Sequence, residues 1–337
     1  MKALIATAKG FIFDTFFTEE NLKLTNSLGT AVWNETEEKL NIDDVKNKIS
    51  DCDVYVTSWG CPKLDNEILK YAPNIKLLCH LCGTVVPVVS DEMWEKGIRV
   101  ISGNDYFAES VAEGTIAYML TSLREIPRYS YNLKVNKQWK DTENPQPTEG
   151  LLGKSVGIVS YGAIAKHLVR MLQVFRVKIK VYDIAPIPEE DKINYGIEQV
   201  SLEDIFSTCD IVTVHTPLND HTYHLITKKH LSLLKKGALF INTSRGPVID
   251  QSALVDELNT GRFSAVLDVY EKEPPEQDDP IYNCPNLIMI PHMGGPTTNL
   301  RQVIAHDLLI EAQEFVDKGA PLKHEITREK AEQMSKG

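Results

Sequence analysis

Residues 155–183 read SVGIVSYGAIAKHLVRMLQVFRVKIKVYD and contain one strand–turn–helix–strand unit. The run SVGIVS is apolar and predicts a buried strand. The helix follows in AIAKHLVRMLQVF, where Ile164, Leu168, Leu172 and Phe175 share one helical face. KIKVYD then supplies a second strand. Two strands joined by a helix are the repeating unit of a parallel sheet, so this stretch predicts an α/β fold.

Small residues occupy the turn before the helix, which reads Ser160-Tyr161-Gly162-Ala163-Ile164-Ala165. Such a turn lets backbone N–H groups at the helix N-terminus face a pyrophosphate. Ser160 and Ala165 replace the first and third glycines of the dinucleotide fingerprint, so an ordinary α/β turn is the alternative. Asp183 ends the second strand, where a carboxylate binds the adenosine ribose and repels the 2′-phosphate of NADP. The unit therefore predicts a site for NAD(H).

The rest of the chain alternates between strand-like and helical runs in two blocks. The first block has short apolar runs at 2–7, 53–57, 75–79 and 98–101, with helical runs at 36–49 and 66–72. The second block has six strand-like runs, at 155–160, 178–183, 210–215, 238–243, 263–269 and 287–290. A short helix is expected to begin at Ser201, because Asp204 follows at capping-box spacing. This alternation predicts parallel sheets covered by helices, with a doubly wound sheet in the second block.

Proline and glycine residues mark the expected ends of the longer helices and the connecting segments. A helix is expected at 110–126, ended by Pro127, and another from about Gln251, closed by Gly261. A long amphipathic helix is expected after Pro296, ending near Gly319. The polar, proline-containing run 137–150 reads as a connector, and 325–337 as a frayed tail.

Composition argues against several classes of partner. The 337 residues carry a formal net charge of -11, which repels nucleic acid and anionic membrane surfaces. No run approaches the roughly 18 apolar residues of a membrane helix, and no signal-peptide cleavage site follows the N-terminal run, which favours the cytoplasm. Six cysteines are too sparse for a disulfide framework. Cys79 and Cys82 form a lone CxxC, for which buried thiols are favoured over redox or metal chemistry, and no metal site is expected.

Three charged side chains follow predicted strands of the second block: Arg245 in FINTSRGPVID, Glu273 in VLDVYEKEPP and His292 in MIPHMGGPTTNL. The ligand crevice of a doubly wound sheet opens at the carboxyl ends of its strands. Each residue alone also fits a structural or solvated role, but their shared position predicts a site. On these ordered motifs the chain resembles the D-isomer-specific 2-hydroxyacid dehydrogenase family, from about Ile75 to Gln313.

The resemblance implies an NAD-dependent dehydrogenase that interconverts a 2-oxo acid and a D-2-hydroxy acid. Arg245 would bind the substrate carboxylate and the 2-oxo oxygen through its bidentate fork. His292 would be the acid–base that gives a proton to that oxygen as hydride is delivered. Glu273 would fix the imidazole through its other nitrogen and favour the imidazolium.

The resemblance also implies which residues contact the cofactor and the substrate. The expected cofactor-binding residues are Tyr161, Gly162, Ala163, Ile164, Asp183, His215, Thr216, Thr243, Ser244, Asp268 and Gly294. His215 is interpreted as a structural or cofactor-pocket residue and not as the acid–base. Backbone amides of Gly83, Thr84 and Val85 are expected to hold the substrate carboxylate. They lie in the loop 82–87, called here the substrate loop, where Val86 and Pro87 replace the usual Asp and Asn. Trp59 fits either a pocket wall or a structural anchor.

The predicted fold is two doubly wound parallel-sheet domains, Rossmann-like and flavodoxin-like, separated by a cleft. Residues 105–296 would be the NAD-binding domain, and 1–104 with 297–337 a discontinuous substrate-binding domain. The family resemblance also implies a homodimer. Two alternatives stay open: a formate dehydrogenase-like enzyme, against which Glu273 speaks, and an NAD(H)-sensing corepressor-like scaffold that keeps the same three residues.

Overall fold

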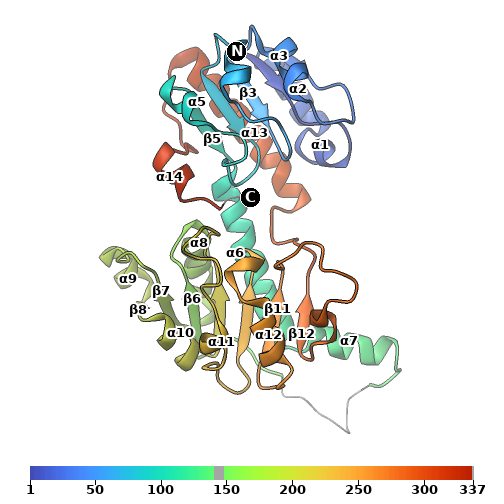
Figure 1. Cartoon of the computed structure of the whole chain (residues 1–337), viewed down its shortest axis with the longest axis vertical. Coiled ribbons are helices and arrows are strands. Elements are labelled where there is room, and N and C mark those ends of the chain that lie inside the picture. Colours follow the sequence, from blue (N-terminus) through green and yellow to red (C-terminus); the bar gives the residue numbers. More distant parts are fainter. Residues whose placement is uncertain (140–147, 336–337) are drawn as a thin grey trace. The chain divides into compact units, whose positions relative to one another are not determined.

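The computed structural model describes residues 1–139 and 148–335, and the chain divides into two compact units (Figure 1). Unit 1 comprises Met1–Ala108 and Pro296–Gly337, and unit 2 comprises Glu109–Gly295. The first boundary falls inside helix α6 (Asn104–Leu123), which begins in unit 1 and continues into unit 2. Part of the expected connector 137–150, residues 140–147, lies outside the described residues.

Unit 1 contains a five-stranded parallel sheet in the order β2-β1-β3-β4-β5. Its strands are β1 (Lys2–Ile5), β2 (Thr30–Trp33), β3 (Val54–Thr57), β4 (Leu77–His80) and β5 (Arg99–Ser102). The chain runs outward from β1 to β2 and then returns to the other side of β1 with β3. This reversal makes the sheet doubly wound and places its topological switch point between β1 and β3.

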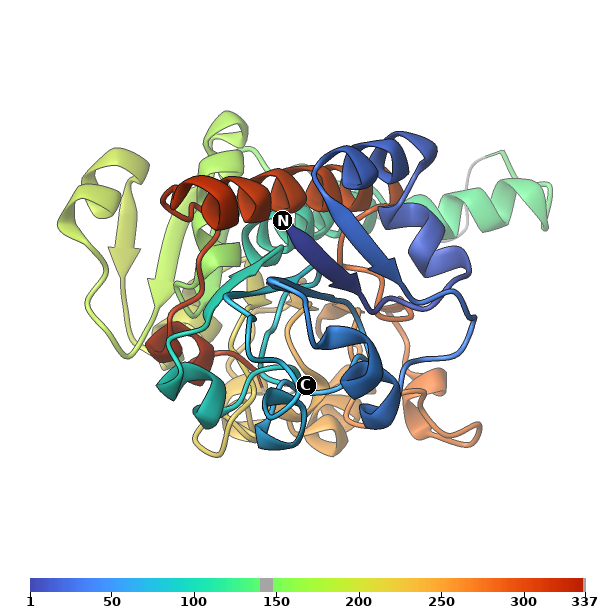
Figure 2. The ribbon, with the colours of Figure 1, turned by 90° about the horizontal axis from the view of Figure 1, so that it is seen from above.

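Helices cover the sheet of unit 1. They are α1 (Phe11–Phe16), α2 (Glu19–Ser27), α3 (Ile42–Ile49), α4 (Asn66–Leu69), α5 (Asp91–Glu95), α13 (Thr298–Lys318) and α14 (Arg328–Glu332). Figure 2 shows the long helix α13 lying across this unit. Its buried face, with Ile304 and Leu308, shares one core with Ile5 and Val56 of the sheet. A second core on this sheet contains Leu4 and Tyr55, because successive strand residues point to opposite faces.

Unit 2 contains a seven-stranded parallel sheet in the order β12-β11-β10-β9-β6-β7-β8. Its strands are β6 (Ser155–Val159), β7 (Lys178–Tyr182), β8 (Ile197–Gln199), β9 (Ile211–Val214), β10 (Leu239–Asn242), β11 (Ser264–Leu267) and β12 (Leu287–Met289). The strand order reverses between β6 and β9, so the ligand crevice is expected at their carboxyl ends. The central strands β6, β9 and β10 are almost wholly buried, as their apolar sequences require.

Besides α6, the helices of unit 2 are α7 (Ile126–Lys134), α8 (Ala163–Leu172), α9 (Glu189–Tyr195), α10 (Leu202–Thr208), α11 (Lys228–Leu231) and α12 (Gln251–Leu258), with 3-10 turns at Gln173–Phe175, Gly246–Val248 and Pro280–Asn283. Unit 2 has two cores, to which α6, α8, α10, α11 and α12 contribute buried side chains. Ser201 caps α10 by accepting the Asp204 amide at 3.1 Å, which confirms the predicted start of that helix. In the described part of the chain, no helix is long and apolar enough to cross a membrane.

The two doubly wound parallel sheets confirm the predicted fold class, but two of the four edge strands, β2 and β8, were missed. β2 and β8 are short and lie at the edges of their sheets, with largely half-buried or exposed side chains. The other two edge strands, β5 and β12, were predicted, because their sequences are apolar. β2 begins with an exposed threonine and β8 contains Glu198 and Gln199, so neither has the apolar run by which the other strands were found.

The expected bounds of two helices were wrong in detail. The helix expected at 110–126 begins at Asn104, and Pro127 lies in the first turn of α7, where its missing N–H costs nothing. The helical run expected at 36–49 is helical only in Ile42–Ile49, because Asn41 caps α3 by accepting the Asp44 amide at 3.0 Å.

The run 325–337 is not a frayed tail over its described part. Ile326 donates its amide to Val100 at 2.9 Å, and Glu325 forms an antiparallel bridge with Ile101 of β5. Helix α14 buries Ala331. The run is mostly polar, and only a few apolar residues, Ile326 and Ala331 among them, pack into the core, so its composition did not predict an ordered structure.

Candidate active site

The dinucleotide turn of unit 2 joins β6 to α8. Ser160 stands at the first position of the fingerprint with φ 77°, a left-handed conformation that glycine adopts without cost. Its hydroxyl lies 2.8 Å from that of Thr216, which follows β9. The fold therefore keeps the glycine-like backbone at this position, and the hydrogen bond to Thr216 offsets part of its strain.

The N-terminus of α8 is built to receive an anion. Gly162 is its N-cap residue and no side chain caps the helix, so the first-turn amides have no side-chain acceptor. A Cβ placed on Gly162 would meet no atom within 4 Å. Uncapped amides beside open space fit the pyrophosphate of a dinucleotide.

Asp183, which follows β7, links the turn to the next loop. Its Oδ2 accepts the Tyr161 amide at 2.7 Å and its Oδ1 accepts the Ala185 amide at 2.8 Å. Carboxylate oxygens have two lone pairs each, so both can still accept a hydroxyl. The carboxylate is thus held at the end of β7, the position from which a ribose is bound in this kind of unit.

His215 lies in a buried hydroxyl network. Its ring nitrogens lie 3.0 Å from Thr213 Oγ1 and 3.3 Å from Thr243 Oγ1, and Thr115 approaches Thr243 from α6 at 3.5 Å. Burial lowers the pKa of His215 to about 3, so its ring is neutral. A neutral, enclosed imidazole supports the interpretation of His215 as a structural or cofactor-pocket residue.

The loop after β10 carries Arg245. Asn242 organises this loop, because its Oδ1 accepts the Ser244 amide at 3.0 Å and its Nδ2 donates to the Arg245 carbonyl at 3.2 Å. Arg245 Nη1 donates to the Ser244 carbonyl at 2.7 Å. Burial lowers the pKa of Arg245, while the carboxylate of Glu273 acts in the opposite direction. Arg245 is therefore a partly desolvated cation, which binds an anion more strongly than a solvated one does.

Gly246 allows the Arg245 loop to approach the loop after β11. A Cβ on Gly246 would lie 1.8 Å from the carbonyl carbon of Tyr270 and 2.4 Å from the Glu271 amide nitrogen. Only a residue without a side chain fits there. This contact fixes the distance between the loops that carry Arg245 and Glu273.

A short hydrogen bond joins His292 and Glu273, which lie on two loops. His292 Nδ1 lies 2.6 Å from Glu273 Oε2, and Glu273 Oε1 accepts the Tyr270 amide at 3.0 Å. The side chains are 49% and 36% exposed, so solvent reaches the pair. No residue of the described chain hydrogen-bonds Nε2 of His292, which leaves that nitrogen available to a ligand.

Asp268 holds the segment after His292. It is 1% exposed and accepts the amides of Met293 and Gly294, both at 2.7 Å. Burial raises the pKa of Asp268, and these two amide bonds oppose that shift. A Cβ on Gly294 would lie 2.6 Å from Asp268 Oδ2, so glycine is required here. Tyr118 of α6 approaches the same carboxylate at 3.5 Å.

Sequence reasoning missed three residues of this edge: Thr115, Tyr118 and Asn242. Asn242 had a usable signal, since a polar residue at the end of an apolar strand is typical of a crevice. Thr115 and Tyr118 had none, because they reach the site from a helix remote in sequence.

The substrate loop lies in unit 1, beyond β4. Ser102 Oγ donates to the Gly83 carbonyl at 3.3 Å, and the Val88 amide donates to the Val85 carbonyl at 2.9 Å. The amides of Gly83, Thr84 and Val85 have no acceptor within residues 1–139 and 148–335. Free amide donors next to fixed carbonyls suit a carboxylate ligand.

Trp59 and the CxxC cysteines also lie in unit 1. The Trp59 ring is 43% exposed, its centroid lies 5.9 Å from that of Phe107, and the Arg301 guanidinium lies 5.3 Å from it. It is thus anchored by neighbours and still open to solvent. Cys79 and Cys82 are buried as expected, and burial raises the pKa of both thiols. Among the described residues, no cluster of His, Cys, Asp and Glu could hold a metal ion.

These features are typical of nicotinamide dinucleotide-dependent oxidoreductases, and comparison with known proteins identifies the family. Residues 116–294 match the model of the D-isomer specific 2-hydroxyacid dehydrogenase, NAD binding domain. The glyoxylate reductase of Thermofilum pendens is 34% identical over 246 residues, which cover 72% of each chain. The D-3-phosphoglycerate dehydrogenase of Methanocaldococcus jannaschii is 32% identical over 83% of this chain, but the match spans only 52% of that longer protein.

A solved structure shows the same fold over the whole chain. The phosphoglycerate oxidoreductase of Rhizobium etli superimposes with a TM-score of 0.80, at 23% identity, over 98% of both chains. The protein therefore belongs to the D-isomer-specific 2-hydroxyacid dehydrogenase family. It is an NAD-dependent dehydrogenase of that family.

Proposed function

We propose that this protein interconverts a 2-oxo acid and a D-2-hydroxy acid with NAD(H). One observation carries the proposal. Arg245 and the His292–Glu273 pair occupy neighbouring loops at the same sheet edge as the dinucleotide turn, and Arg245 is close enough to Glu273 for their charges to interact. A cation for the substrate and an acid–base beside it are what reduction of a 2-oxo acid needs.

Arg245 is the proposed substrate-binding cation. Its guanidinium fork matches a carboxylate and the adjacent 2-oxo oxygen, and its desolvation strengthens both contacts. In the reductive direction negative charge grows on that oxygen, so Arg245 stabilises the transition state more than the bound ground state.

His292 is the proposed acid–base. Glu273 occupies Nδ1, so the proton passes through Nε2, which donates it to the substrate oxygen in reduction and accepts it in oxidation. Glu273 stabilises the imidazolium and fixes the ring plane. The nicotinamide supplies and accepts the hydride when bound.

The two units have separate proposed roles. Residues 105–296 bind NAD(H) through Tyr161, Gly162, Ala163, Ile164 and Asp183, and through His215, Thr216, Thr243, Ser244, Asp268 and Gly294. Residues 1–104 and 297–337 bind the substrate, with the amides of Gly83, Thr84 and Val85 holding its carboxylate. We further propose a homodimer, to be tested by light scattering of the purified protein.

The experiment follows NADH absorbance with pyruvate, hydroxypyruvate, glyoxylate and branched and aromatic 2-oxo acids. Arg245→Ala should lower kcat/KM at least about 100-fold, the cost of losing one oxyanion-stabilising donor. NADH affinity should stay nearly unchanged. Arg124→Ala, an exposed arginine near the end of α6, is the matched control and should keep full activity.

Three results would overturn the proposal. An Arg245→Ala enzyme that keeps more than about a tenth of wild-type kcat/KM contradicts the role of Arg245. Tight NADH binding by the wild type without turnover of any acid in the panel favours the binding scaffold. Turnover of formate with NAD, measured in the same assay, favours the formate dehydrogenase alternative.

A further inference from the structure

Thr84 of the substrate loop is held from two sides. Its hydroxyl donates to the Ser335 carbonyl at 3.0 Å. Its backbone carbonyl lies near the ring of His80, where it opposes the lowering of the His80 pKa by burial, and His80 Nδ1 lies 2.9 Å from Thr57 Oγ1. His80 is buried at the end of β4 and belongs to the rigid sheet. Thr84 therefore connects that sheet edge with a segment more than 250 residues later in the chain.

The segment that ends at Ser335 begins at a buried anchor on α13. Glu311 accepts the amides of Lys323 at 2.6 Å and His324 at 2.9 Å, and it also pairs with His324 Nδ1 at 2.5 Å. One carboxylate thus fixes the backbone direction and a side chain of the same turn. Charge-assisted hydrogen bonds of this kind are stronger than neutral ones.

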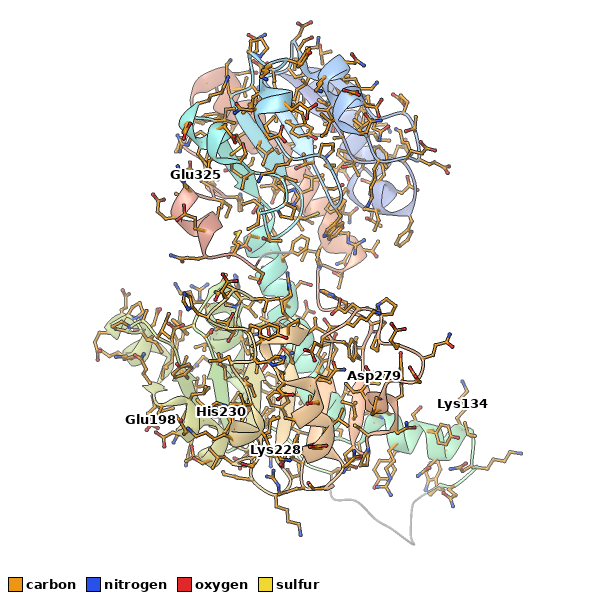
Figure 3. All side chains as sticks on the ribbon, viewed as in Figure 1. Lys134, Glu198, Lys228, His230, Asp279 and Glu325 are labelled. Atoms are coloured by element: carbon orange, nitrogen blue, oxygen red, sulfur yellow. The ribbon has the colours of Figure 1, made fainter. Side chains whose placement is uncertain are left out.

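The segment then runs beside β5. Glu325 bridges Ile101 in antiparallel register, and Arg99 Nη2 donates to Glu325 Oε2 at 2.6 Å. Figure 3 labels Glu325 in this segment. Ile326 donates to the Val100 carbonyl at 2.9 Å. Through these contacts, residues 325–326 pair with the free edge of β5 and extend the sheet of unit 1 by a short antiparallel bridge.

Apolar anchors hold the segment further along. Ile326 is 6% and Ala331 5% exposed, and both belong to the core that contains Val85 of the substrate loop. Arg328 donates to Asp91 of α5 at 2.7 Å. The substrate loop and α14 thus pack on the same core, so a displacement of α14 is expected to disturb the substrate loop.

We propose that the segment 323–335 positions the substrate loop, and that Thr84 is the positioning residue through which it acts. The proposal rests on the proposed function, in which the amides of residues 83–85 hold the substrate carboxylate. Ser335 fixes the side chain of Thr84, and the core shared by Val85, Ile326 and Ala331 holds the loop from beneath. Loss of either contact lets the amides turn away from the geometry that a carboxylate requires.

The test compares Thr84→Val with Thr84→Ser in the full-length enzyme. Valine has nearly the same shape as threonine but lacks the hydroxyl donor. It should raise KM for the 2-oxo acid about 3- to 10-fold, the effect of one lost neutral hydrogen bond, with little change in kcat. Serine keeps the donor and should restore KM. The dissociation constant of NADH should stay the same in both. The melting temperature of Thr84→Val should fall by no more than about 4 °C, the cost of one hydrogen bond.

Removing residues 335–337 deletes the acceptor, leaves Met334 in the core beneath the substrate loop, and should raise KM by at least the same factor. Because Thr84→Val and the truncation both remove the bond between Thr84 and Ser335, their effects on KM should not multiply in the double variant. Thr25→Val is the matched control: it also removes a hydroxyl-to-carbonyl bond in unit 1, 2.6 Å to Asn21, but lies on α2. It should leave KM unchanged.

Two results overturn this proposal alone, provided that the wild type is active. One is a Thr84→Val enzyme with the wild-type KM. The other is a double variant in which the KM increases of Thr84→Val and of the truncation multiply. A wild type that binds NADH but turns over no 2-oxo acid overturns the proposed function, and this proposal with it. A KM increase in Thr84→Ser equal to that in Thr84→Val would show that shape and not the hydrogen bond matters, and would also overturn it.

Discussion

Glu273 Oε2 lies 2.6 Å from Nδ1 of His292, while Oε1 of the same carboxylate accepts the backbone amide of Tyr270 at 3.0 Å. One side chain therefore fixes both the imidazole and the loop from which the carboxylate itself projects. His292 has φ 51°, and its amide donates to the Asp268 carbonyl at 2.9 Å. The backbone and the ring of His292 are thus held independently, which sets the direction in which Nε2 points.

Glu273→Gln should lower kcat/KM about 10- to 100-fold without changing the dissociation constant of NADH. The amide keeps the shape but loses the charge-assisted bond to His292, a loss of about 1.5–3 kcal/mol. Stopped-flow or steady-state rates with the best 2-oxo acid provide the measurement. Glu271→Gln is the control, because Glu271 lies in the same loop but pairs with His224. Equal losses in the two variants would refute the specific role of Glu273.

Asp183 should make the wild-type enzyme prefer NADH to NADPH. The carboxylate at the end of β7 repels a 2′-phosphate, so kcat/KM with NADH should exceed that with NADPH by at least about tenfold. Asp183→Asn removes the charge and should narrow this ratio. Glu198→Gln, a change of an exposed acid on the neighbouring strand β8, should leave the ratio unaltered (Figure 3). Equal use of both cofactors by the wild type contradicts the assignment.

Gly246→Ala should destabilise the protein and lower its activity together. The new Cβ would lie 1.8 Å from the Tyr270 carbonyl carbon, so one backbone must move and the loops of Arg245 and Glu273 must separate. We expect a loss of about 1–3 kcal/mol in the free energy of unfolding. Gly114→Ala in α6 meets nothing within 4 Å and should gain up to about 1 kcal/mol. Urea unfolding of both variants checks this, and similar stabilities would contradict it.

The inner strands and the charged residues that follow them could be predicted from the sequence. Arg245, Glu273 and His292 each come directly after an apolar run, and the parallel sheet brings such positions to one edge. The same logic failed for β2 and β8, because the short runs TAVW and IEQ lack a continuous apolar pattern. Local sequence also gave no sign that Ala331 and Ile326 complete a core with residues 85–100.

Residues that hold the site from a distance lie beyond any sequence pattern. Tyr118 approaches Asp268 across 150 positions, and Thr84 meets Ser335 across 251. Such pairs depend on how helices and loops return to the sheet, which periodicity does not encode. Gly246 and Gly294 are similar, since only the structure shows which backbone or carboxylate a side chain there would strike.

Ser160→Gly should give a more stable protein than Ser160→Ala. Both variants lose the hydroxyl contact with Thr216, but alanine keeps the unfavourable left-handed φ of 77° and glycine does not. A left-handed conformation costs a residue with a Cβ about 1–2 kcal/mol. Glycine avoids this cost but loses more backbone entropy on folding, which offsets about 0.5–1 kcal/mol of the gain. We expect the glycine variant to be about 1 kcal/mol more stable in denaturant unfolding. The reverse order would show that φ at residue 160 is not strained.

Asp210 should make the stability of unit 2 depend on acid pH. It accepts the amide and the hydroxyl of Ser155 at 2.8 and 2.7 Å and pairs with Lys235 at 3.0 Å, which ties β6 to the start of β9. Burial opposes the charged form, but these bonds prevail and lower the pKa of Asp210 from 3.8 to about 2.

A carboxyl whose pKa is lower in the folded than in the unfolded state contributes stability above the unfolded pKa. That contribution is lost as the pH falls through the folded pKa, because the unfolded chain binds the proton more readily. The difference in unfolding free energy between wild type and Asp210→Asn should therefore be constant above about pH 5 and shrink between about pH 4 and pH 2. Ser155→Ala removes part of the same network and should weaken the pH dependence without abolishing it. A difference that stays constant down to pH 2 would mean that the bonds to Ser155 and Lys235 do not favour the ionised carboxylate.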